Sequence, residues 1–145
     1  MSTLSKILEK YHLTYNNDWL LEIPNVDRSH LAFLLHDLDF KTGVEIGVFE
    51  GRYSEVLATK NPQMKIWGVD AWRQYTANPF VGNKSADQST YDRYYEKTKK
   101  RMGKFKNYEL IREWSMDAVH RFKNHSLDFV YIDADHSYKF ALDDI

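Results

Sequence analysis

The stretch that decides the fold is Gly43-Val44-Glu45-Ile46-Gly47-Val48-Phe49-Glu50-Gly51. Its first half is short, partly β-branched and bounded by glycines, which is typical of a strand that runs into a tight turn. An apolar stripe at Tyr53, Val56 and Leu57 follows with helical spacing and stops before Pro62. The stretch therefore predicts a strand, a glycine-rich turn and a helix in immediate succession.

The same alternation continues along the chain. Further strands are predicted at 64–70, 108–111 and 127–132, with helices over 91–102, from a Ser115 cap onward, and over 138–145. The apolar run 127–132 is expected to be a strand buried on both faces of a parallel sheet. Strands that alternate with helices predict an α/β, Rossmann-like, doubly wound and mostly parallel sheet.

Two amphipathic helices are predicted ahead of this region, at 3–11 and around a stripe from Leu31 to Leu38. We therefore expect an N-terminal helical extension over 1–40 and a Rossmann-like domain over 41–145. No Gly, Pro or basic turn closes the last helix. The expectation is that this is the front part of a larger domain, without the C-terminal strands of the usual fold.

Composition narrows the possible functions. The 145 residues are 43% hydrophobic and 28% charged, with a formal net charge of -1, so no basic field indicates a nucleic-acid partner. No apolar run reaches the roughly 18 to 20 residues of a membrane span, and no signal peptide is recognisable, which predicts a cytoplasmic protein without a membrane partner. The absence of cysteine excludes disulfides and thiolate sites.

Acidic residues follow the predicted strands where a ligand would bind. In an open parallel sheet, ligands lie outside the carboxyl ends of the strands. Asp70 ends the second strand, and Asp133, Asp135 and His136 follow the fourth. The glycines 43, 47 and 51 lack the dinucleotide spacing G-x-G-x-x-G, so the looser turn suits a nucleoside without a pyrophosphate. The alternative is that these glycines only form a turn and a close packing point.

Three motifs in order give a family resemblance. The segment 44–51 resembles the E/D-x-G-x-x-x-G motif of class I S-adenosylmethionine-dependent methyltransferases, 67–70 (WGVD) resembles their second-strand acid motif, and 127–138 (LDFVYIDADHSY) resembles the fourth-strand segment of the small-molecule and sugar O-methyltransferase-like branch. The resemblance implies S-adenosylmethionine as cofactor and a small-molecule or sugar acceptor, methylated at oxygen.

The resemblance also implies roles for individual residues. Glu45 would support the glycine loop, Asp70 would hold the ribose hydroxyls, and Asp133 would face the cofactor's amino group, the substrate or a divalent ion. The expected cofactor-binding set is Glu45, Gly47, Val48, Phe49, Gly51, Tyr53, Asp70, Ala71, Trp72, Ser115, Met116, Asp117 and Asp133.

Methyl transfer from a sulfonium needs alignment of the reactants more than it needs protein chemistry. A base is required only where the acceptor loses a proton, and Asp133 and His136 are the catalytic candidates, since histidine exchanges protons near neutral pH. His136 could equally be a capping or supporting residue. Asp133 and Asp135 could instead bind Mg²⁺ through oxygen.

Other interpretations remain open at this level. Asp133-x-Asp135 after an apolar strand also resembles the D-x-D motif of nucleotide-sugar glycosyltransferases, although that leaves the glycine loop and Asp70 without a role. A non-catalytic cofactor-binding or interaction module is a further alternative, and exposed strand edges would favour a homo-oligomer. The basic run 93–106 is interpreted as the solvated face of a helix whose tyrosines cover the sheet, with a nucleic-acid patch as its alternative.

Overall fold

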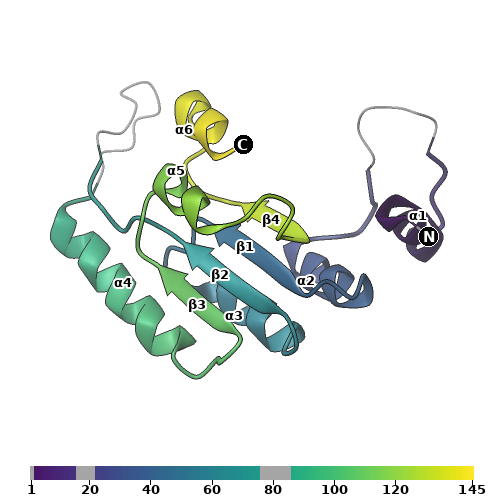
Figure 1. Ribbon diagram of the computed structural model, residues 1–145, viewed down its shortest axis with the longest axis horizontal. Helices are drawn as coiled ribbons and strands as arrows, with labels where there is room; N and C mark the ends of the chain where they lie inside the picture. The colour runs from purple at the N-terminus through teal and green to yellow at the C-terminus, as the bar shows by residue number, and fades with distance from the viewer. Residues whose placement is uncertain (1, 16–21, 76–85) are drawn as a thin grey trace.

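A computed structural model describes residues 2–15, 22–75 and 86–145. Its centre is a parallel sheet of β1 (Thr42–Ile46), β2 (Lys65–Val69), β3 (Tyr108–Ile111) and β4 (Phe129–Ile132), in the order β3-β2-β1-β4 (Figure 1). The strand order reverses between β1 and β4, which is the switch point of a doubly wound sheet. The predicted Rossmann-like α/β fold is confirmed.

Helices precede, connect and follow these strands. They are α1 (Thr3–Tyr11), α2 (Arg28–Asp37), α3 (Arg52–Lys60), α4 (Gln88–Met102), α5 (Ser115–Ala118), the 3-10 turn η2 (Val119–Arg121) and α6 (Tyr138–Asp144). Figure 1 shows α2 and α3 behind the sheet, α4 alongside β3, and α5 and α6 together above the strands. Within the described residues, every helix is too short or too polar to cross a bilayer.

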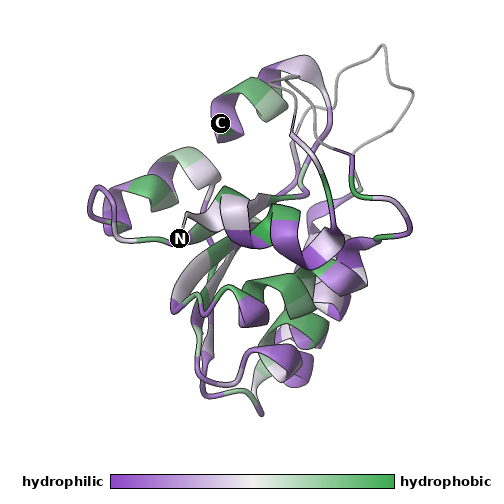
Figure 2. Ribbon diagram, turned by 90° about the vertical axis from the view of Figure 1, so that its right-hand side faces the viewer, coloured by the Kyte–Doolittle hydropathy of each residue, from purple (hydrophilic) through white to green (hydrophobic). Residues whose placement is uncertain are grey.

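One face of the sheet carries the larger core. Ala32 and Leu35 of α2 pack with Leu57 of α3, Ile66 of β2 and Met102 of α4. Figure 2 shows hydrophobic and hydrophilic segments alternating along the helices, as expected of helices with one buried side. Since α2 shares this core, the helix is held firmly beside the strands; the division of the chain at residue 40 stays a prediction.

The other face is covered more thinly. Val44, Val69 and Ile111 pack there against Ala118 at the end of α5. The expectation that residues 127–132 form a strand buried on both faces is wrong, because alternate side chains of a strand point to opposite faces and only one face of β4 packs against a hydrophobic core. Phe129 and Tyr131 pack on the larger core, whereas Val130 and Ile132 are 50% and 41% exposed.

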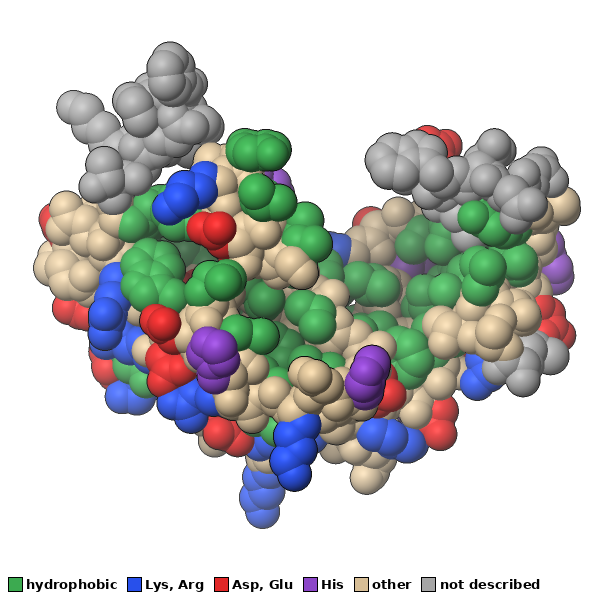
Figure 3. Space-filling view, turned by 45° about the horizontal axis from the view of Figure 1, so that its top comes forward, with side chains coloured by type: hydrophobic (Ala, Val, Ile, Leu, Met, Phe, Trp, Pro, Cys, Tyr) green, Lys and Arg blue, Asp and Glu red, His purple; other side chains and the backbone are tan. Residues whose placement is uncertain are grey.

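The prediction that Ser115 caps a helix is also wrong. The cap residue is Trp114, which makes no side-chain capping bond, and Ser115 is the first helical residue, its hydroxyl hydrogen-bonded to the Asp144 carboxylate of α6. Met116 and Val119, the apolar residues that follow Ser115, are both 53% exposed. Figure 3, in which the top of Figure 1 comes forward, shows hydrophobic side chains gathered on the side of the molecule where α5 and α6 lie.

Candidate functional site

A cavity of about 800 Å³ lies at the carboxyl ends of the strands. Segments that follow all four strands contribute to its wall, as the switch-point rule predicts. The predicted residues that line it are Glu45, Gly47, Val48, Phe49, Tyr53, Asp70, Ala71, Trp72, Ser115, Asp133, Asp135 and His136. Gly51, Met116 and Asp117 are not among the lining residues.

The glycine loop after β1 brings backbone directly against backbone. Gly47 has a φ of 92°, a conformation that residues with a Cβ rarely adopt. A Cβ on Gly47 would lie 2.3 Å from the carbonyl oxygen of Asp133, so β1 and β4 approach each other here only because the residue is glycine. Gly51 has a φ of 71° and faces α4, where a Cβ would meet the Thr98 methyl at 3.0 Å. Gly51 thus serves close packing rather than the cavity wall.

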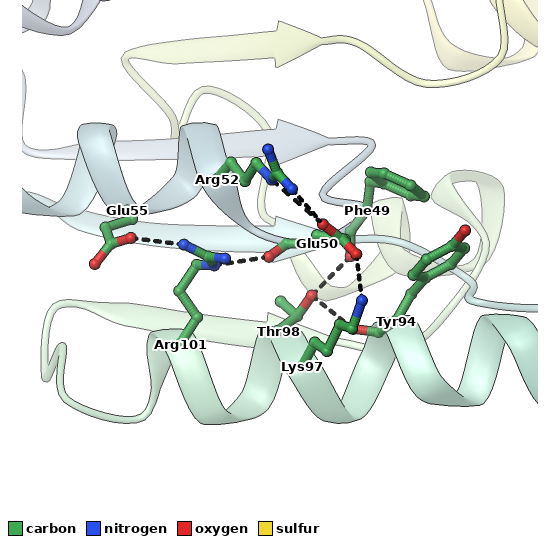
Figure 4. Close-up of polar contacts among 8 residues, drawn as sticks. All are labelled: Phe49, Glu50, Arg52, Glu55, Tyr94, Lys97, Thr98 and Arg101. Atoms are coloured by element: carbon green, nitrogen blue, oxygen red, sulfur yellow. Dashed lines mark hydrogen bonds and ion pairs between the residues drawn. The ribbon is translucent and has the colours of Figure 1, made fainter.

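Helix α4 holds the loop from the side, as Figure 4 shows. The Thr98 hydroxyl donates to the Phe49 carbonyl at 2.7 Å, and the Arg101 Nε donates to the Glu50 carbonyl at 3.0 Å. The Lys97 ammonium lies 2.8 Å from the Glu50 carboxylate. The basic run is exposed at most of its Lys and Arg residues, as the interpretation of a solvated helix face expects, while Lys97 and Arg101 also contact the loop.

The tyrosines of α4 differ from the expectation that they cover the sheet. Tyr94 packs against Phe49 with ring centroids 4.5 Å apart, and Tyr95 packs against Trp72 at 4.9 Å. They contact the segments that extend beyond the ends of β1 and β2, and so they form the outer support of the cavity.

The Asp70 carboxylate holds the backbone of the glycine loop by hydrogen bonds. Its Oδ2 accepts the backbone N–H groups of Val48 at 3.1 Å and Phe49 at 2.9 Å, and its Oδ1 accepts the N–H of Trp72 at 2.8 Å. Burial raises the pKa of Asp70, and these three hydrogen bonds act against that rise. Asp70 lines the cavity at the same time, so its role at the ribose hydroxyls stays a prediction.

Glu45 lies beneath the loop and is almost fully buried, with 1% of its surface exposed. Its Oε2 accepts the Ser54 hydroxyl at 2.6 Å and also the Tyr108 hydroxyl. Burial raises its pKa from 4.5 to about 7, and the two hydrogen bonds oppose this rise. Glu45 thereby joins β1 to α3 and β3, a supporting position like the one that the resemblance implies.

Asp133 is surrounded by polar groups at the end of β4. Arg28 Nη1 lies 3.2 Å from its Oδ2, and the Tyr131 hydroxyl lies 3.3 Å from the same oxygen. His136 Nε2 lies 3.5 Å from Oδ1, which is an ion-pair distance but too long for a good hydrogen bond. Sequence reasoning missed Arg28, because no local pattern relates a helix's first residue to an aspartate far along the chain.

Asp135 faces a different partner. The Tyr75 hydroxyl donates to its Oδ2 at 2.7 Å, and the Ser137 N–H donates to its Oδ1 at 2.8 Å. Burial acts to raise the pKa of Asp135, but these bonds outweigh it and hold the pKa below its usual range. The Tyr75 ring lies edge-on to Phe140 at 5.3 Å and to Trp114 at 6.2 Å, so aromatic side chains form this wall.

A family model described as a methyltransferase domain matches residues 44–145. The chain belongs to this methyltransferase family. The match covers the glycine loop and every lining segment from β1 onward, which favours the methyltransferase interpretation over the glycosyltransferase one.

Solved structures agree with the fold of this methyltransferase domain. Cofactor-bound Rv0187 from MTB matches 92% of this chain at 17% identity with a TM-score of 0.52. The O-methyltransferase from Bacillus cereus in complex with SAH matches 98% at 17% identity with a TM-score of 0.51. The matches cover 53% and 60% of those two chains, so this chain spans between half and two thirds of their length. No curated protein sequence matches it significantly.

The methyltransferase domain offers little for a divalent cation. Within the described residues, no group of three or more His, Asp and Glu side chains could hold a metal ion. Asp133 and Asp135 are engaged separately, the first by the Arg28 guanidinium and the second by a tyrosine hydroxyl. The predicted Mg²⁺ pair does not fit this arrangement.

Proposed function

We propose that the cavity binds S-adenosylmethionine and that the chain takes part in methyl transfer to an oxygen of a small-molecule or sugar acceptor. The observation that carries the proposal is the convergence of the Gly47 loop, Asp70 and Asp133 on one cavity within a methyltransferase-family domain. The loop admits a ligand to the backbone, and the two carboxylates can receive hydroxyl and ammonium donors.

The cavity fits such a cofactor in size and in chemistry. A volume of about 800 Å³ lies within the usual range of small-molecule sites, roughly 300 to 1,000 Å³. Aromatic side chains at Trp72 and Trp114 supply apolar wall for a purine, while polar groups gather at the Asp133 end. The similar structure from Bacillus cereus is an O-methyltransferase in complex with SAH, which supports the same cofactor and an oxygen acceptor here.

When bound, the cofactor supplies a methyl group on a sulfonium, which needs no activation by the protein. The chain's own contribution is to hold the ligand at the glycine loop and to exclude water with the aromatic wall. We assign to His136, which is 83% exposed at the cavity edge beside Asp133, the role of taking a proton from an acceptor hydroxyl. No step is assigned to a metal ion.

Calorimetric titration of the chain with S-adenosylhomocysteine tests the proposal, with NAD and UDP-glucose plus Mn²⁺ as alternative ligands. We expect binding of S-adenosylhomocysteine alone, weakened roughly tenfold or more by Asp70→Asn, because that change disrupts the acceptor of the loop N–H groups. Asp37→Asn, on an exposed carboxylate paired with Lys10 away from the cavity, is the matched control. UDP-glucose binding would favour a glycosyltransferase, and no binding by the folded chain would favour a non-catalytic module.

A further inference from the structure

Arg28 is placed at the cavity by contacts with Tyr53. It is the first residue of α2, and its guanidinium lies over the Tyr53 ring, 5.3 Å from the centroid. The Tyr53 hydroxyl donates to the Arg28 backbone carbonyl at 2.7 Å, so ring and hydroxyl fix both ends of the residue. Since Tyr53 is a buried residue of α3, Arg28 has a defined position although its side chain is 60% exposed.

The ion pair that Arg28 forms is open to the cavity. Its Nη1 lies 3.2 Å from Asp133 Oδ2, the Asp133 side chain is 33% exposed, and both residues line the cavity. A pair this exposed contributes little to stability, so a ligand can separate its members at small cost. Asp133 also touches the glycine loop through its backbone, which puts the pair beside Gly47.

Arg52, another arginine on the cavity wall, is arranged differently. Arg52 is held by the Glu50 carboxylate, with its Nε at 3.3 Å and its Nη2 at 3.1 Å from Oε2. Its guanidinium is therefore already engaged within the loop, and its side chain is 76% exposed. Unlike Arg52, Arg28 pairs with a cavity-lining aspartate and not with a residue of the loop.

We propose that Arg28 binds the α-carboxylate of the cofactor's amino-acid end, while Asp133 receives the α-ammonium group. The two protein charges match the two charges of a zwitterion, and the ligand replaces one ion pair by two. A guanidinium presents parallel N–H donors that suit a carboxylate. The inference rests on the proposed function, and it assigns to α2 a direct part in ligand recognition.

The test compares three ligands by calorimetry on the wild-type chain and on Arg28→Gln. The ligands are S-adenosylhomocysteine, its decarboxylated analogue, which keeps the amine, and 5′-methylthioadenosine, which lacks both charged groups. We expect the wild type to bind S-adenosylhomocysteine roughly tenfold or more tightly than the decarboxylated analogue. In Arg28→Gln this preference should disappear, because affinity falls for S-adenosylhomocysteine but stays within about twofold for the other two ligands.

Matched controls separate recognition from structure. Arg52→Gln removes an equal charge from the same cavity wall and should leave the ligand preference unchanged, whereas Arg28→Lys should retain part of it. Thermal unfolding should show that Arg28→Gln is folded, as expected for an exposed side chain.

The proposal is overturned if Arg28→Gln keeps the wild-type preference, or if it weakens all three ligands equally, which would indicate a purely structural role. If the wild-type chain binds none of the nucleosides, the proposed function fails with it. Wild-type binding with an unchanged preference in Arg28→Gln overturns the Arg28 assignment alone.

Discussion

Replacement of Glu45 by glutamine should remove a specific pH dependence of stability. The carboxyl group has a folded-state pKa of about 7 against an ordinary value of 4.5, and burial is the main cause. Between these two values the unfolded chain releases the proton while the folded chain retains it, so stability falls as pH rises. Below pH 4.5 both states are protonated and the contribution is fully present; above about pH 7 it is lost.

The pKa difference sets the size of the effect. A folded value of about 7 against 4.5 corresponds to about 3 kcal/mol of free energy of unfolding across the window. Glutamine keeps an oxygen that can accept the Ser54 and Tyr108 hydroxyls, yet it does not ionise. The stability of Glu45→Gln relative to wild type should therefore increase by about 3 kcal/mol from pH 4.5 to about pH 8.

Urea unfolding followed by tryptophan fluorescence, at a series of pH values in that range, measures this difference. Glu55→Gln is the matched control, because Arg101 and Lys104 hold the pKa of Glu55 below its usual range. Because Glu55 is ionised in both states above its ordinary pKa of 4.5, the stability of Glu55→Gln relative to wild type should stay nearly constant over this range, and it should rise only as pH falls below about 4.5. A difference between Glu45→Gln and wild type that is flat with pH would refute the argument, since it would mean that Glu45 titrates alike in both states.

Three further substitutions test the packing around the site. Gly68→Ala would place a Cβ 2.1 Å from the Tyr108 hydroxyl, so we expect a loss of about 1–3 kcal/mol in urea unfolding. Gly47→Ala would force a Cβ to 2.3 Å from the Asp133 carbonyl at a φ of 92°, and calorimetry should show S-adenosylhomocysteine affinity reduced roughly tenfold or more. Thr98→Val removes a hydroxyl that donates to a loop carbonyl, and it should cost about 1 kcal/mol in unfolding and weaken the same ligand severalfold.

Each of these predictions has a control or a contrary outcome. Gly103→Ala is the control for the two glycine substitutions. Its Cβ would lie 3.0 Å from the nearest backbone oxygen, and the φ of Gly103 is -61°. Thr59→Val, on the exposed side of α3, is the comparison for Thr98. Unchanged ligand affinity in both Gly47→Ala and Thr98→Val would mean that the loop does not contact the ligand.

Most of the fold is predictable from the sequence because the signals for it are local. The strand at 108–111 and the helix ending before Pro62 follow from short-range patterns, and the structure has both. The failure at 127–132 has a physical reason: an apolar run shows that a segment suits a sheet, but not whether other elements cover both faces of the strand. The prediction for Ser115 fails because its hydroxyl is used by Asp144 of α6, a partner that no cap rule anticipates.

The location of the site was predictable for a topological reason. Parallel strands place their carboxyl ends at one edge, so acids after different strands must converge, and Asp70 and Asp133 do line one cavity. Arg28 could not be found in this way, since it precedes the sheet and reaches the cavity only through the packing of α2 on α3. Long-range placement of that kind depends on tertiary contacts that no periodicity records.

Two residues at the site adopt an unfavourable backbone conformation, and hydrogen bonds from neighbouring residues hold them in it. Phe49 and Trp72 both have positive φ values, 53° and 42°, although neither is glycine, and such conformations cost about 1–3 kcal/mol each. Asp70 accepts the N–H groups of both residues, and the Trp72 indole donates to the Phe49 carbonyl at 2.8 Å. Each strained residue therefore helps to hold the other, and Thr98 adds a second donor to the same carbonyl. The cost of these conformations is met when the chain folds, so the loop is already ordered before a ligand binds. More of the interaction energy therefore remains for binding.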